Sequence, residues 1–244
     1  MKRSKITILL AIVLGMTFHS CLDLEPQDQL GGKNMWTSVN DYKQFANTFY
    51  SWTRDFSSVV YDGTHSDKRS DLITYQSYNE FSRGINSIPS SDANYTDNYK
   101  HIRRTNLLLQ NAEAYAKPED IKQYIGEAYF FRAYSYFDLL QLYGDVIITK
   151  KPLDITDPEM KVKRNDRSEV VDLIIDDLNH AVENLPAFKE LTTEEEGRIS
   201  KEGAQAFLSR VALYEGTWQK SRNGNQNTQR SANLLDIAAK AART

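Results

Sequence analysis

Several features are scarce in this sequence of 244 residues, and each scarcity excludes a class of protein. A single cysteine excludes an internal disulfide, a cysteine-built zinc site and an iron–sulfur cluster. Glycine and proline together make up about 7% of the chain, against about 12% in average usage, which favours long helices. The 30 basic and 33 acidic residues give a net charge of −3, which excludes a nucleic-acid binder that acts through a large cationic field.

Long apolar runs are also scarce, and the longest one lies at the amino terminus. Residues 1–5 carry three basic side chains, residues 6–16 are apolar, and Ser20 precedes the lone Cys21. This order is typical of a secretory signal peptide, since a membrane-spanning helix needs about 20 apolar residues. The mean hydropathy of −0.58 excludes a membrane protein with several spans.

The position of Cys21 resembles that of the acylated cysteine in a bacterial lipoprotein, where this residue becomes the new amino terminus. We therefore interpret residues 1–20 as a lipoprotein signal peptide and residues 21–40 as a lipidated tether. The alternative is an ordinary secretory signal followed by an incidental buried cysteine. Lipidation at Cys21 would anchor the protein to a membrane by its amino terminus.

Six stretches of the chain place apolar residues three or four positions apart, which is the spacing of one helix face. They predict helices around residues 42–56, 99–109, 119–143, 170–185, 204–218 and 234–241. Residues 57–91 lose this periodicity, and an irregular stretch of that length is often functional. A polar spacer is expected at residues 221–231. The fold class predicted from these patterns is all-α.

The stretch from 119 to 143 is apolar almost all round, so it predicts a helix in the middle of the structure. Pro118 suits the first turn of this helix, because the missing N–H is not needed there. Gly144 is placed to end it. Asp166 and Glu169 have the spacing of a capping box at the start of the next helix.

An internal echo indicates repeated helical hairpins. Four residues recur with an offset of 78 positions: Ala128, Tyr129, Arg132 and Tyr136 match Ala206, Phe207, Arg210 and Tyr214. This offset is about two tetratricopeptide-type repeats, whose period is near 34 residues, plus insertions. Arg132 and Arg210 lie inside apolar helices, so we expect each to bridge a neighbouring carboxylate or helix end.

The sequence lacks the motifs of the common enzyme classes. It contains no His-Glu-x-x-His pair, no Gly-x-Ser-x-Gly elbow, no phosphate loop and no dinucleotide fingerprint. Adjacent carboxylates such as Asp176 and Asp177 diverge around a helix instead of converging on a substrate. We therefore expect no catalytic residue, no cofactor and no metal site.

Four segments resemble one known family as a set. They are the Tyr99-Lys100-x-Ile102-x-x-x-Asn106 helix, the Gly126-Glu127-Ala128-Tyr129-Phe130-Phe131-Arg132-Ala133 run that continues to Gly144-Asp145-Val146, the stretch 168–186, and Gly197-Arg198-Ile199-Ser200-Lys201. Together they resemble the SusD/RagB family of outer-membrane nutrient-uptake lipoproteins of Bacteroidota. Family members carry a proline where this chain has Ile147.

The resemblance implies an all-α fold built on tetratricopeptide-like repeats. It also implies a surface-exposed outer-membrane lipoprotein that captures a glycan or similar nutrient and passes it to a TonB-dependent, SusC-like transporter. Family members are considerably longer, so we expect residues 41–244 to be an amino-terminal helical domain truncated at its carboxyl end. The alternative function is a tetratricopeptide-like scaffold that binds another protein and no glycan.

A glycan-binding site would use aromatic rings, because the C–H face of a sugar stacks on them. Tyr75, Tyr78, Asn79 and Tyr95 lie in or beside the irregular stretch and are the candidate ligand contacts. Loops held by a rigid scaffold commonly carry function. The alternative is that these aromatic side chains only pin the loop to the helices.

Overall fold

The computed structural model describes residues 35–54, 83–85, 87–222 and 228–243, and its residues from Trp36 onward belong to one compact unit. The α-helices of this unit are α2 (Val39–Asn47), α4 (Ala93–Glu113), α5 (Lys122–Tyr143), α6 (Arg167–Asn184), α7 (Lys201–Arg222) and α8 (Thr228–Ala241). Short 3₁₀ turns join them: η1 (Thr48–Trp52), η4 (Pro118–Ile121), η5 (Pro158–Lys161), η6 (Phe188–Glu190) and η7 (Thr193–Glu195). The predicted signal peptide lies outside the described residues.

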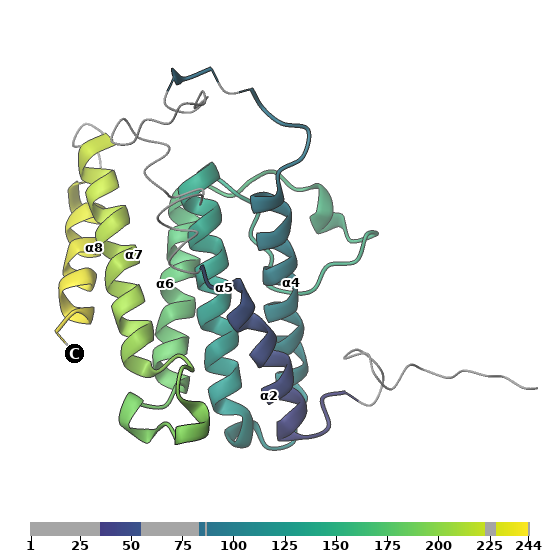
Figure 1. Ribbon diagram of the computed structural model, residues 1–244. Coiled ribbons are helices and arrows are strands. Elements are labelled where there is room, and N and C mark those ends of the chain that lie inside the picture. The colour runs from purple at the N-terminus through teal and green to yellow at the C-terminus, as the bar shows by residue number, and fades with distance from the viewer. Residues whose placement is uncertain (1–34, 55–82, 86, 223–227, 244) are drawn as a thin grey trace, which may run out of the picture. The chain divides into compact units, whose positions relative to one another are not determined.

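The predicted all-α fold is confirmed. Within the described ranges the β-structure consists of one isolated antiparallel bridge between Val146 and Asn165. Helices α4 to α8 stand side by side, and each runs antiparallel to the one before it (Figure 1). This succession of helical hairpins is the tetratricopeptide-like arrangement that the 78-residue echo predicts.

Helix α5 lies in the middle, as its apolar circumference predicts. It packs against α2, α4 and α6, and thirteen of its residues are buried. Pro118 opens the 3₁₀ turn that leads into α5, and Gly144 ends the helix with a φ of 73°. Gly126 permits the close approach of α6, because a Cβ atom there would lie 2.9 Å from Cγ of Leu185.

Other local predictions agree with the structure in part. The N–H of Asp166 donates to the Glu169 carboxylate (3.0 Å), which is one half of the predicted capping box. The expected helix from residue 42 ends early, because α2 passes at Asn47 into a 3₁₀ turn. The expected polar spacer is shorter than predicted, since Ser231 is buried in α8 and its hydroxyl donates to the carbonyl of Gly216 (2.8 Å).

Three arginine–carboxylate pairs with buried carboxylates tie neighbouring helices together. Their closest nitrogen–oxygen distances are 2.6 Å for Arg132 with Asp177, 2.6 Å for Arg198 with Glu127 and 2.8 Å for Arg167 with Glu215. The first pair joins α5 to α6, and the last joins α6 to α7. The prediction for Arg132 is therefore confirmed. A buried ion pair is costly to break, because the remaining charge stays out of water.

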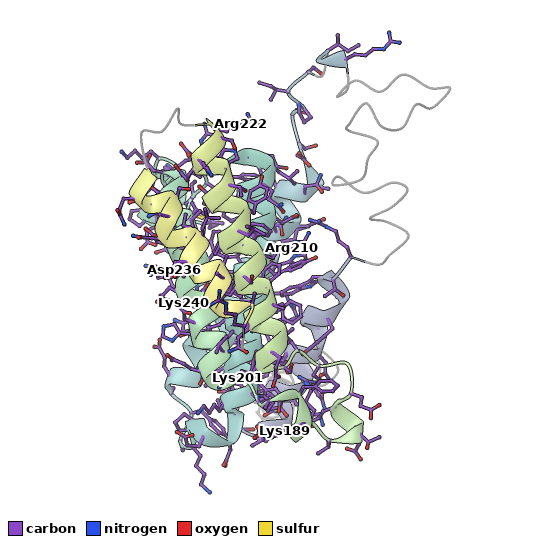
Figure 2. All side chains as sticks on the ribbon, turned by 90° about the vertical axis from the view of Figure 1, so that its left-hand side faces the viewer. Lys189, Lys201, Arg210, Arg222, Asp236 and Lys240 are labelled. Atoms are coloured by element: carbon purple, nitrogen blue, oxygen red, sulfur yellow. The ribbon has the colours of Figure 1, made fainter. Side chains whose placement is uncertain are left out.

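The prediction for Arg210 is wrong. Arg210 is exposed on α7, and no carboxylate of the described residues forms an ion pair with it (Figure 2). The carboxylate that α7 buries, Glu215, is instead paired with Arg167 from the start of α6. The aromatic contacts differ as well, because Phe207 packs on Phe137 of α5 (5.6 Å between centroids) whereas its counterpart Tyr129 stacks on His180 of α6 (4.9 Å).

No helix within the described residues is both long and apolar enough to cross a membrane.

Candidate functional site

A groove of about 470 Å³ runs along α4, and we call it the α4 groove. One side is a face of α4, and the other is the chain that follows α5. Its lining residues are Tyr95, Thr96, Tyr99, Lys100, Arg103, Ile147, Thr149, Lys151, Leu153, Glu159 and Met160.

The helical side of the α4 groove presents two tyrosine rings and one arginine. Tyr95, Tyr99 and Arg103 follow one another at intervals of four residues, so they share one face of the helix. The ring of Tyr95 lies 4.8 Å from that of Tyr99 and 5.3 Å from that of Tyr143, measured between centroids. The Tyr143 hydroxyl donates to Asp92 (2.7 Å), the residue that caps the amino terminus of α4.

Residues 146–151, which we call the groove wall, form part of the opposite side. The Tyr99 hydroxyl accepts a hydrogen bond from the N–H of Ile147 (2.9 Å) and donates one to its carbonyl oxygen (2.8 Å). Burial raises the pKa of Tyr99, so its phenol stays neutral and can both donate and accept. The backbone of the groove wall is therefore held against α4.

Opposite charges balance one another along the rim. Lys100 pairs with Asp97 (2.7 Å), and Lys151 pairs with Glu159 (2.8 Å). The hydrogen bond to Glu159 raises the pKa of Lys151, so this lysine is charged at neutral pH. Arg103 donates to the carbonyl of Leu153 and lies 4.0 Å from Asp154. The rim offers hydrogen-bond donors without an excess of positive charge.

Of the predicted ligand contacts, the structure places Tyr95 in the α4 groove. Tyr75, Tyr78, Asn79 and the lipidation site Cys21 lie outside the described residues, so these predictions stay untested. Tyr99, Arg103 and Lys151 also line the groove, and they were not among the predicted contacts. The four-residue spacing from Tyr95 to Arg103 is a signal that could have identified Arg103, whereas Lys151 has no comparable pattern.

A second groove, of about 660 Å³, lies between α6 and α8. Its apolar lining residues are Ile175, Leu234 and Ile237, and its polar ones include Asp172 and Arg230. None of its described lining residues is aromatic, so these residues provide no ring on which a sugar could stack. The α4 groove is therefore the better candidate for a glycan.

Comparison with known proteins identifies the family. The profile of the SusD-like family described as "Starch-binding associating with outer membrane" matches residues 22–213, most of the chain. The chain belongs to this SusD-like family. The resemblance inferred from the four sequence segments is thereby confirmed, and the family is one described as binding starch.

Curated relatives of this chain include two SusD-like proteins of one organism. SusD-like protein P38 of Formosa agariphila is 28% identical over 87% of this chain and 42% of its own length. SusD-like protein P2 of the same organism is 28% identical over 91% of this chain and 45% of its own length. The chain therefore spans less than half the length of these relatives.

Solved structures show the same fold. A SusD-like protein from Bacteroides fragilis superposes with a TM-score of 0.66 at 25% identity, over 89% of this chain and 41% of that one. A structure named as a laminarin-binding SusD-like protein superposes with a TM-score of 0.52 at 29% identity, over 65% of this chain and 32% of that one.

Proposed function

We propose that this SusD-like protein binds a neutral oligosaccharide in the α4 groove and passes it to a TonB-dependent, SusC-like outer-membrane transporter, without covalent chemistry. The observation that carries the proposal is the pair of tyrosine rings, Tyr95 and Tyr99, in a groove of about 470 Å³. The family's description as starch-binding supports it. The glycan named for the laminarin-binding relative makes laminarin a suitable probe beside starch.

The chemistry of the α4 groove suits a sugar without charge. Tyrosine rings supply apolar area for the C–H face of a pyranose, and each also carries a polar hydroxyl. Thr96, Thr149 and the charged rim side chains supply partners for sugar hydroxyls. Because Lys100 and Lys151 already face carboxylates, an anionic glycan would have to displace Asp97 and Glu159 to use them.

The test compares two tyrosines at opposite ends of α4. Tyr95 lines the groove, whereas Tyr115 follows the far end of the helix and packs on Tyr42 (5.1 Å between centroids). A ligand that binds only the folded state raises the unfolding temperature, so laminarin or starch should raise that of the unaltered protein and of Tyr115→Ala. Tyr95→Ala should abolish the shift. No shift with either glycan, or equal loss in both variants, would refute the proposal.

Cell-surface attachment is a separate part of the proposal. Lipidation of Cys21 would hold the protein at the outer membrane, where a transporter could receive the glycan. Replacement of Cys21 by alanine should move the protein from the membrane fraction to the soluble fraction. An unchanged distribution would contradict lipidation at this residue and would leave the glycan test unaffected.

The alternative function is a scaffold that binds another protein. The groove between α6 and α8 favours it, since its aliphatic residues Ile175 and Ile237 are flanked by polar side chains. Such a scaffold would respond to substitutions in that groove and not to Tyr95→Ala. Glycan binding that depends on Tyr95 therefore separates the two functions.

A further inference from the structure

The groove wall is not helical, and within the described part of the chain no strand lies beside it. Its one backbone pairing in the described residues is the bridge in which the N–H of Asn165 donates to the carbonyl of Val146 (2.9 Å). Buried backbone groups need hydrogen-bond partners, and here side chains provide them. The wall's geometry therefore depends on particular side chains and not on a sheet.

The side chain of Tyr136 provides the backbone of Thr149 with the hydrogen bonds that a neighbouring strand would otherwise make. Its hydroxyl accepts a hydrogen bond from the N–H of Thr149 (2.8 Å) and donates one to the carbonyl oxygen of the same residue (3.2 Å). Tyr136 is fully buried in α5, and burial raises its pKa. The phenol is thus neutral at physiological pH and can make both bonds at once.

Asn106 holds the next part of the wall. Its side-chain Nδ2 donates to the carbonyl oxygens of Thr149 (2.9 Å) and Lys151 (3.3 Å). Its Oδ1 accepts from Nη1 of Arg132 (2.8 Å), and Nε and Nη2 of Arg132 donate to Asp177 (2.8 and 2.6 Å). A guanidinium can only donate, so it fixes the Asn106 amide with its oxygen toward Arg132 and its nitrogen toward the wall.

Neither Tyr136 nor Asn106 lines the α4 groove, whereas Thr149 and Lys151 do. We infer that Tyr136 and Asn106, the latter oriented by Arg132 and Asp177, are positioning residues that set the ligand affinity of the α4 groove through the wall. This inference rests on the proposed function for its ligand. It concerns buried residues that a glycan does not touch.

The experiment compares Tyr136→Phe with Tyr42→Phe in the full chain. Both tyrosines are fully buried, and the Tyr42 hydroxyl donates to the carbonyl of Asn111 (3.0 Å), away from the groove. Amide hydrogen exchange of Thr149, the unfolding temperature and the affinities for laminarin and starch are measured for each protein. Both substitutions remove a buried hydroxyl from its hydrogen bonds, so both should lower the unfolding temperature.

The two variants should differ at the groove. Tyr136→Phe should make amide exchange at Thr149 about tenfold faster or more, because its hydrogen-bond acceptor is removed. It should also weaken glycan binding roughly tenfold, whereas Tyr42→Phe should leave both quantities unchanged. Unchanged exchange at Thr149, or faster exchange with unchanged affinity, would overturn the inference.

A failure of the proposed function gives a different result. If the unaltered protein binds neither laminarin nor starch, the glycan proposal fails, and the assignment of an affinity-setting role fails with it. Faster exchange at Thr149 in Tyr136→Phe would still show that the wall is held as described. If the unaltered protein and Tyr42→Phe bind the glycan and Tyr136→Phe binds it more weakly, both proposals stand.

A second variant covers the case in which Tyr136→Phe does not fold. Asn106→Asp is nearly isosteric and can still accept from Arg132, but an ionised carboxylate cannot donate to Thr149 or Lys151. Its control is Asn111→Asp, since Nδ2 of Asn111 donates within α4 to the carbonyl of Leu107 (2.7 Å). Asn106→Asp should weaken glycan binding, and Asn111→Asp should not. Equal affinities in the two variants would overturn the inference.

Discussion

Replacing Asp177 by asparagine tests whether the buried ion pair holds the helices together. The control is Asp172→Asn, the same substitution five residues earlier on α6. Both aspartates pair with an arginine, at 2.6 Å for Asp177 with Arg132 and 2.8 Å for Asp172 with Arg230. The two pairs differ in burial, because Asp177 is 0% exposed and the Asp172 side chain is 63% exposed.

The expected magnitudes follow from that difference. Removal of one partner of a buried pair costs about 3–5 kcal/mol, since the other charge stays desolvated. Asparagine can keep one hydrogen bond to Arg132, so the lower end, about 3 kcal/mol, is expected for Asp177→Asn. An exposed pair contributes about 0–1 kcal/mol, which is the loss expected for Asp172→Asn. For a domain of this size, 3 kcal/mol corresponds to about 6–12 °C in unfolding temperature.

Urea unfolding followed by circular dichroism measures both losses. The difference in midpoint, multiplied by the common slope, gives the change in the free energy of unfolding. Losses within about 0.5 kcal/mol of each other would refute the reasoning, because burial would then not decide the strength of the pair. A loss below about 1 kcal/mol for Asp177→Asn would refute it as well.

Two further predictions concern packing and protonation. Gly126→Ala should destabilise the fold by about 1 kcal/mol. Overpacking against Leu185 costs about 1–3 kcal/mol, and the higher helix propensity of alanine offsets about 1 kcal/mol of that cost. A Cβ atom at Gly203 would lie 2.6 Å from Cδ1 of Ile199, the flexible end of that side chain, so Gly203→Ala should be neutral or stabilising. A lower urea midpoint for Gly203→Ala than for Gly126→Ala would contradict this. Burial, aided by nearby cations and opposed by Asp97, lowers the pKa of His101 to about 4, so the unfolded chain binds more protons between pH 6.5 and 4. The free energy of unfolding should therefore decrease as the pH falls from 6.5 to 4, and it should decrease less steeply in His101→Gln. A pKa near 6.5 for His101, measured by NMR in the folded protein, would contradict this prediction.

The helices were predictable because burial imposes a period on the sequence. Helix α5 shows this most clearly: its apolar circumference predicts a central position, and Gly144 marks its end correctly. Its start is less accurate, since Pro118 opens a 3₁₀ turn and α5 itself begins at Lys122. The bridging role of Arg132 was predictable for the same reason, since a charge on an apolar face needs a partner. The error at Arg210 has a physical cause, because the sequence echo does not reveal that α7 exposes that position.

The α4 groove was not predictable in the same way. Tyr99 and Ile147 are 48 residues apart, and their contact joins a side chain to the backbone of a non-helical segment. Such bonds leave no period in the sequence, because any residue can supply a backbone carbonyl and any residue except proline a backbone N–H. Tyr95 was a candidate only because it is an aromatic residue beside an irregular stretch.

The residues that hold the α4 groove and those that would contact its ligand are largely different. Arg132 and Asn106 lie in the segments by which the chain resembles its family, yet neither lines the groove: Asn106 donates to the wall, and Arg132 holds Asn106. Tyr95 and Arg103 line the groove and are not among the motif residues. Under the proposed function, changes at Tyr95 and Arg103 would alter which sugar fits while the wall keeps its hydrogen bonds. Changes at Arg132 and Asn106 would instead loosen the wall, so they would affect every ligand that uses it.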